Sequence, residues 1–190
     1  MTEQSDPPAT APASRRRSGL WIAAAVLSAI AVFNLSVWAP AASALSKDSR
    51  NADAAQVHVY RSWLIHPRDI TIDLVSVDTA APVDLMRALF QVAATMKGRK
   101  FGRVTLARQG RPVYQMSGED FTALGQAYDA NENPVYLIRT LPESLKRPDG
   151  TEAFGTWTGG WLGVLSRQME DVNAFAQGWV EGEAPARAAY

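Results

Sequence analysis

A long apolar run begins just after a cluster of arginines near the N-terminus. Residues 20–39 contain no Asp, Glu, Lys or Arg, and Trp21 and Trp38 stand near the two ends of the run. About 20 apolar residues are needed to cross the hydrocarbon of a bilayer as a helix, and indole rings favour the interface beside it. The pattern predicts a transmembrane signal-anchor over residues 19–39.

The residues on either side of this run differ in charge. Arg15, Arg16 and Arg17 precede it, whereas the residues that follow it carry charges of both signs. Because basic residues are retained on the cytoplasmic side, we expect a single-pass protein of the inner (plasma) membrane with its N-terminus in the cytoplasm. Residues 1–18 have the composition of a disordered tail, and the small and polar residues 40–54 suit a linker.

A cleaved signal peptide is the alternative to a permanent anchor. Ala42, Ser43 and Ala44 have the small-x-small form of a cleavage site and follow the apolar run. The run is longer than the roughly 7–15 residues of a usual signal peptide, which favours the anchor. Both alternatives predict export of the remaining chain.

After the anchor, the apolar pattern changes to that of a folded domain. Residues 70–77 alternate between apolar and polar and are rich in β-branched side chains, which predicts a strand. From Pro82 to Gly98 an apolar stripe recurs at helical spacing, with Pro in the first turn and Gly at the stop. Residues 56–65 are ambiguous between helix and strand.

The next segments predict a hairpin, a helix and a further strand. Residues 103–108 and 111–116 are short runs separated by a turn that contains Gly110, as in a β-hairpin. Residues 117–130 begin with a Ser and an Asp three positions later, and apolar residues follow at helical spacing. After an Asn-Pro break, residues 135–140 favour a strand.

Together these segments give the order βαββαβ, which predicts an α+β domain of the ferredoxin-like kind, preceded by the transmembrane helix. A closing helix over residues 160–179 is added to it, because large apolar residues recur there on one side. We expect the domain to occupy residues 55–181 and a disordered tail to occupy residues 182–190.

Composition excludes several classes of function. Lys plus Arg and Asp plus Glu both number 19, so no net charge attracts nucleic acid. The chain has no Cys, which removes disulfides and thiolate chemistry. His58 and His66 are its 2 histidines, too few for a histidine-rich metal site in a monomer. We therefore expect neither a metal nor a cofactor.

No catalytic residue is predicted, so we expect the protein not to be an enzyme. Asp69, Asp73 and Asp78 recur along one strand and its exit, but their spacing does not require them to converge, as acid and base would. His66 stands before a proline and is typical of a surface loop residue. The serines fit no nucleophile elbow, and the glycines fit no phosphate-binding loop.

The most unusual local composition is a loop with two indoles among glycines. Trp157 and Trp161, with Gly159 and Gly160 between them, could form a flat apolar platform for a small-molecule ligand or a partner's side chain. The alternative is that the glycines lead into the last helix and both rings fill the core.

Basic residues also cluster around the predicted hairpin, where they suit either anionic headgroups, an acidic partner or a solvated sheet edge. They are Arg99, Lys100, Arg103, Arg108 and Arg111. The leading functional hypothesis is a membrane-anchored envelope protein whose domain mediates interaction with other envelope proteins. The alternatives are a ligand-binding module that uses the Trp157/Trp161 loop and an exported protein with a cleaved signal peptide.

Overall fold

The computed structural model describes residues 14–52, 55–62, 66–78 and 81–185. The chain divides into two units, Met1–Phe33 and Asn34–Tyr190. Helix α1 (Ser14–Ser46) contributes to both of them. Residues 1–13 of the predicted cytoplasmic tail and the last residues of the predicted C-terminal tail lie outside the described residues, whereas residues 14–18, also predicted as part of the tail, are helical and belong to α1.

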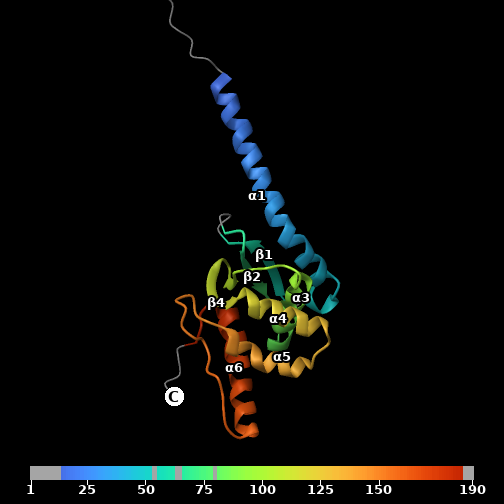
Figure 1. Cartoon of the computed structure of the whole chain (residues 1–190), viewed down its shortest axis with the longest axis vertical. Helices are drawn as coiled ribbons and strands as arrows, with labels where there is room; N and C mark the ends of the chain where they lie inside the picture. The colour runs from blue at the N-terminus through green and yellow to red at the C-terminus, as the bar shows by residue number, and fades with distance from the viewer. Residues whose placement is uncertain (1–13, 53–54, 63–65, 79–80, 186–190) are drawn as a thin grey trace, which may run out of the picture. The chain divides into compact units, whose positions relative to one another are not determined.

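The first unit contains an exposed apolar helix (Figure 1). Leu20 and Trp21 are 71% and 76% exposed. The candidate span Gly19–Ser46 has a mean hydropathy of 2.2, and only 6% of its most apolar window is buried. A helix that is apolar around its circumference and not covered by protein is typical of a membrane anchor or a signal sequence. The predicted apolar helix is confirmed in this sense.

The second unit begins with the last turns of α1, followed by α2 (Ser49–Ala52). Residues 40–46 and 49–52, predicted as part of a linker, are helical. Val37 and Ala41 are spaced one helical turn apart and are both buried in the core of the unit. The small residues that suggested a flexible tether are also good helix formers, and this apolar pair gives them a surface to pack on.

The described residues of the second unit form a four-stranded sheet in the order β1-β2-β3-β4. Neighbouring strands are antiparallel except for the parallel central pair, β2 and β3. The predicted strand and hairpin are confirmed, and residues 56–61 of the segment 56–65, which the sequence left open, belong to β1. Gln109 and Gly110 make the hairpin turn with φ of 50° and 79°. The strands are β1 (Ala55–Arg61), β2 (Asp69–Val77), β3 (Arg103–Arg108) and β4 (Arg111–Ser117).

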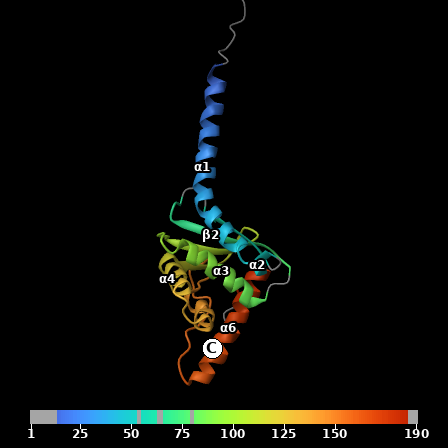
Figure 2. The same ribbon diagram turned by 90° about the vertical axis from the view of Figure 1, so that its right-hand side faces the viewer.

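Helices α3 (Pro82–Met96), α4 (Gly118–Asp129) and α6 (Trp161–Glu181) lie on one side of this sheet (Figure 2). Helix α3 is the crossover that makes β2 and β3 parallel. Alternate residues of β2 face the helices and are fully buried. Aromatic residues of α6 are fully buried as well. These core residues include Ile70, Ile72, Leu74, Phe175 and Trp179.

The predicted strand at residues 135–140 is wrong. This segment is the helix α5 (Pro134–Thr140), and a 3₁₀ turn, η1 (Leu141–Ser144), follows it. Pro134 occupies the first helical turn, and the side-chain oxygen of Asn133 accepts a 3.0 Å hydrogen bond from the Val135 amide, which caps the helix. The βαββαβ order is therefore not found, and the α+β class stands without the ferredoxin-like topology.

Candidate functional site: a groove between α4 and α5

Trp157, the first indole of the predicted loop, contacts α6. Its ring nitrogen donates a 2.6 Å hydrogen bond to a carboxylate oxygen of Asp171, and the guanidinium of Arg167 lies 5.5 Å from its ring centroid. Asp171 is only 7% exposed, and this burial raises the pKa of its carboxyl, although the Trp157 hydrogen bond acts in the opposite direction. The Trp157 indole thus already has partners on α6 within the domain.

Trp161, the second indole, begins α6 and is 72% exposed. Gly160 caps the helix in an extended conformation, and Gly159 has a φ of 130°, which side-chain-bearing residues rarely adopt. The adjacent Leu162 is 67% exposed. The loop therefore leaves its second indole open to solvent, so that a ligand or partner surface around Trp161 stays a prediction.

The polar residues of β2 take part in hydrogen bonds within the domain. Asp73 is 7% exposed, and its carboxylate accepts bonds from the Tyr60 hydroxyl at 3.3 Å and the Gly110 amide at 2.9 Å. Burial and then the charge of Asp73 raise the pKa of Tyr60 to about 12. A carboxylate oxygen of Asp69 accepts a bond from the Arg103 amide at 3.1 Å. These contacts hold the sheet and its turns together.

Neither a metal centre nor an acid–base pair is supported by the remaining candidates. Among the described residues, no group of three or more His, Asp and Glu side chains converges as metal ligands do. His66 and Asp78 are exposed at opposite ends of β2, outside the strand.

Helix α4 presents two different faces. Phe121 is fully buried, and a β-carbon added at Gly125 would lie 2.3 Å from the backbone oxygen of Ala93, so this face is in close contact with α3. Ala123 and Ala127 are on the other face, which borders a groove of about 540 Å³. Because these two residues are small and one helical turn apart, the side chains of α4 do not fill the groove.

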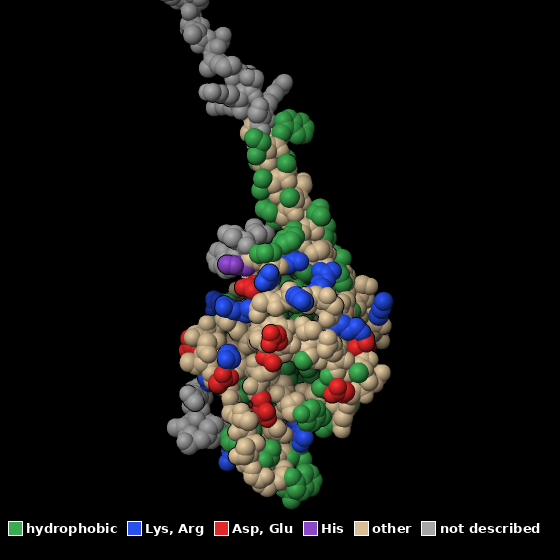
Figure 3. Space-filling view, viewed as in Figure 1, with side chains coloured by type: hydrophobic (Ala, Val, Ile, Leu, Met, Phe, Trp, Pro, Cys, Tyr) green, Lys and Arg blue, Asp and Glu red, His purple; other side chains and the backbone are tan. Residues whose placement is uncertain are grey.

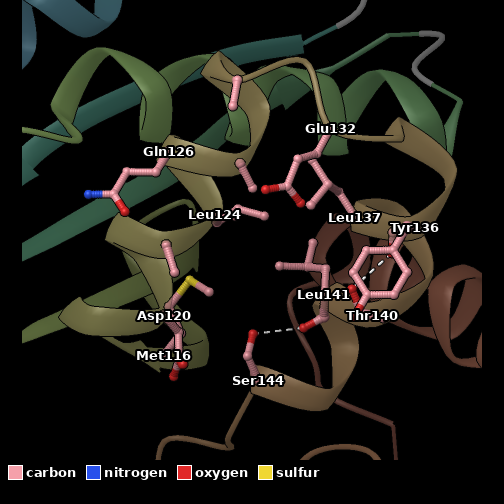
Figure 4. Close-up of a pocket in the computed structure, with 13 residues that line it drawn as sticks. Met116, Asp120, Leu124, Gln126, Glu132, Tyr136, Leu137, Thr140, Leu141 and Ser144 are labelled. Atoms are coloured by element: carbon pink, nitrogen blue, oxygen red, sulfur yellow. Dashed lines mark hydrogen bonds between the residues drawn. The ribbon is translucent and has the colours of Figure 1, made fainter.

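The opposite wall of the groove comes from α5 and η1, and its floor is apolar (Figure 4). Leu137 and Leu141 project from α5 and η1 and are 5% and 3% exposed, and Met116 at the end of β4 is equally well buried. Tyr136 is 49% exposed at the side of the groove. An apolar floor reached from solvent is the usual form of a site for an apolar side chain.

The charged side chains that line the groove are acidic. Asp120 and Glu132 are both exposed and lie at opposite ends of it (Figure 4), and the described lining contains no Lys, Arg or His. The hydroxyl of Ser117 lies 2.6 Å from a carboxylate oxygen of Asp120. The same hydroxyl accepts a hydrogen bond from the backbone amide of Asp120, and this bond caps the start of α4. Glu132 follows α4 and reaches over the groove from the connection to α5.

This groove could not be predicted from the sequence, because a strand was expected where one of its walls is a helix. Two signals pointed to the helix: the Asn133-Pro134 cap, and the spacing of four between Leu137 and Leu141. The second unit is thus an α+β domain with an acidic-rimmed apolar groove, linked to an apolar N-terminal helix. Comparisons with protein-family models, curated proteins and solved structures gave no match.

Proposed function

We propose that this chain is a single-pass, membrane-anchored envelope protein whose extracytoplasmic domain mediates protein interaction or assembly. The exposed apolar helix supports the anchor, since only 6% of its most apolar window is buried. The arginines at positions 15–17 support an N-terminus in the cytoplasm. The cleavage-like residues 42–44 lie inside α1, and Val37 and Ala41, which precede them, are buried in the core of the second unit, so cleavage after Ala44 would remove side chains on which the domain packs. This position favours an uncleaved chain.

The groove between α4 and α5 is the proposed docking site, and its acidic rim is the observation on which this function rests. Its occupant is a short amphipathic helix of a partner protein that places apolar side chains on Leu137 and Leu141. Basic residues at the two ends of that helix would meet Asp120 and Glu132. An acidic helix would suffer repulsion at both ends, so charge determines which partner is accepted.

A peptide-binding experiment tests the groove with defined probes. Two synthetic helices share Leu residues at positions i, i+3 and i+4 and differ only in having Lys or Glu at both ends. We expect the Lys-flanked peptide to bind the detergent-solubilised full chain at least about tenfold more tightly. Ala123→Arg, which fills the groove and offsets one of its two negative charges, should abolish that binding.

The matched control is Asn173→Arg, which adds the same charge at an exposed position of α6. It should leave the affinity of the Lys-flanked peptide unchanged. Equal affinities for the two peptides, or equal effects of the two Arg variants, would contradict the groove as the docking site.

The anchor is tested separately by the mass of the chain recovered from membranes. We expect the uncleaved chain, retained in the membrane after alkaline carbonate extraction. A mature chain that begins at Leu45 would show that the apolar segment is a signal peptide.

A further inference from the structure

Basic side chains from two distant parts of the sequence meet at one end of the second unit. Lys97, Arg99 and Lys100 stand in the connection from α3 to β3, and Arg68 stands in the connection from β1 to β2. Together they line a hollow of about 780 Å³. The amide of Gly102 donates a 2.8 Å hydrogen bond to the Arg68 carbonyl, which joins the two connections. We name the four basic residues the basic hollow.

The charge of the basic hollow is mostly uncompensated. Lys97 is paired with Asp129, and the exposed Glu119 also lines the hollow. None of the ion pairs within the described ranges includes Arg68, Arg99 or Lys100. In Figure 3, Lys and Arg side chains gather toward one end of the unit, while Asp and Glu are more spread out. An anion approaching this end meets a positive field.

The basic hollow lies close to the residue at which the second unit begins. The Arg61 amide donates a 2.9 Å hydrogen bond to the side-chain oxygen of Asn34, the first residue of this unit. Burial, and then the nearby positive charge of Arg99, lower the pKa of Arg61, so Arg99 lies within electrostatic reach of it. Arg61 also bonds to the Pro67 carbonyl, next to Arg68. These contacts link Asn34 to the basic hollow.

Asn34 lies within the apolar run of residues 20–39, so the second unit begins before that run ends. A span of about 20 residues from Gly19 ends near Trp38, whose indole is 45% exposed and suits the interfacial region. Asn34 is four residues before Trp38, about 6 Å along a helix axis. Asn34 thus stands, along the chain, close to the end of the span at which the chain leaves the bilayer, and it is hydrogen-bonded to Arg61.

We infer that Arg68, Arg99 and Lys100 bind the anionic phospholipid headgroups of the membrane in which the chain is anchored, an inference that rests on the proposed anchor. Guanidinium and ammonium groups near a bilayer are attracted to anionic lipids, and the attraction is screened by salt. An acidic protein is a weaker candidate, since the contacts through Arg61 connect the hollow to Asn34, which stands in the apolar run itself. This contact limits how the domain can tilt on its anchor.

The absence of cysteine from the chain permits a single-probe test in full-length protein. Gly98→Cys introduces the probe beside the basic hollow, where an added β-carbon meets no atom within 4 Å. The labelled chain is placed in lipid nanodiscs of phosphatidylcholine alone, or of equal parts phosphatidylcholine and phosphatidylglycerol. Both contain a lipid with a nitroxide on its headgroup, which quenches a nearby fluorophore.

We expect quenching to be at least about twofold greater in the anionic discs, and raised salt to remove the difference. Arg99→Gln combined with Lys100→Gln should lower the quenching to the level of the neutral discs. The control pair, Lys146→Gln with Arg167→Gln, removes two charges from other elements and should preserve the difference. A probe at Asn173→Cys on α6 should not respond to lipid charge.

Equal quenching in the two lipid compositions, or an unaltered response in the Arg99/Lys100 variant, would overturn the inference. These results remain distinguishable from failure of the anchor. A chain that does not co-elute with the discs, or that has lost its apolar segment, contradicts the proposed anchor and with it the inference. A disc-bound chain without a charge response contradicts only the lipid contact.

Discussion

The indole nitrogen of Trp157 donates a 2.6 Å hydrogen bond to the carboxylate of Asp171, which is 14 residues later and almost buried. The contact ties the glycine-rich loop to α6. It also explains why a charged residue stands among the apolar positions of that helix, because a buried carboxylate is tolerated only with a partner. Burial still dominates and raises the pKa of Asp171.

The raised pKa of Asp171 predicts a pH-dependent stability. A carboxyl whose pKa is higher in the folded state binds its proton more tightly there than in the unfolded state. Its contribution to the free energy of unfolding is therefore fully present below the ordinary pKa of 3.8, and it is lost as pH rises through the pKa of the folded state. Asp171→Asn should remove this loss, so that the melting temperature of the detergent-solubilised variant declines less than that of wild type from pH 3.8 upward.

The control for this measurement is Asp149→Asn. Hydrogen bonds from Thr151 lower the pKa of Asp149, so its contribution has the opposite sign and is lost as pH falls. Melting curves of Asp171→Asn that run parallel to wild type across this range would contradict the prediction.

The second prediction compares two tryptophans of α6 with opposite surroundings. Trp179 is fully buried and donates a 2.8 Å bond to the Ala107 carbonyl, whereas Trp161 is 72% exposed. Trp179→Phe should lower the free energy of unfolding by about 1–3 kcal/mol, because a buried acceptor loses its donor. Trp161→Phe should change it by less than about 0.5 kcal/mol.

Denaturant unfolding followed by circular dichroism measures both values, since that signal does not depend on the substituted indoles. Equal losses in the two variants would show that Trp161 is also packed against the domain. Such a result would remove the exposed indole on which the alternative ligand surface depends.

The strand β2 is predicted correctly because apolar and polar residues alternate along it. Ile70, Ile72 and Leu74 face the helices and are fully buried, whereas the residues between them are polar and point to the other face of the sheet, so the period of two identifies the face that the helices cover. The hairpin was equally accessible, because Gly110 at a φ of 79° marks the turn locally. Neither prediction needed information from distant residues.

The segment at residues 135–140 shows where local reasoning fails. Val135, Tyr136 and Ile138 favour a strand by intrinsic preference, but Leu137 packs in the core and the Asn133 cap starts a helix. Tertiary burial decides between these competing signals. The groove could not be predicted from local patterns either, because its walls are brought together by the packing of α4 and α5.

The third prediction concerns the packing of α4 on α3. A β-carbon at Gly125 would lie 2.3 Å from the Ala93 oxygen, so Gly125→Ala must separate the two helices. We expect a loss of about 1–3 kcal/mol in the free energy of unfolding. At Gly163, on α6, an added β-carbon meets nothing within 4 Å, so Gly163→Ala should be stabilising by up to about 1 kcal/mol.

Chemical denaturation of the two alanine variants gives opposite signs if this packing is correct. A stabilised Gly125→Ala variant would mean that α3 and α4 do not approach so closely. Because α4 also forms a wall of the groove, Gly125→Ala should in addition weaken binding of the Lys-flanked peptide.

The last prediction tests whether residues 40–52 belong to the domain or form a tether. The amide nitrogen of the Asn51 side chain donates bonds to the Gln91 side-chain oxygen at 2.7 Å and the Leu45 carbonyl at 3.1 Å. Asn51 is 7% exposed, so Asn51→Ala leaves two acceptors without this donor and should cost about 1–2 kcal/mol. Ser46→Ala, which removes only an exposed bond to the Ser43 carbonyl, is the control.

Hydrogen exchange of the full chain separates the two descriptions. In a folded segment, amides of residues 42–52 are protected, and Asn51→Ala accelerates their exchange while α6 is unaffected. In a tether, these amides exchange rapidly in wild type and neither variant alters them. Protection would show that residues 42–52 pack on α3 through Asn51 and Gln91, whereas rapid exchange would show a flexible tether.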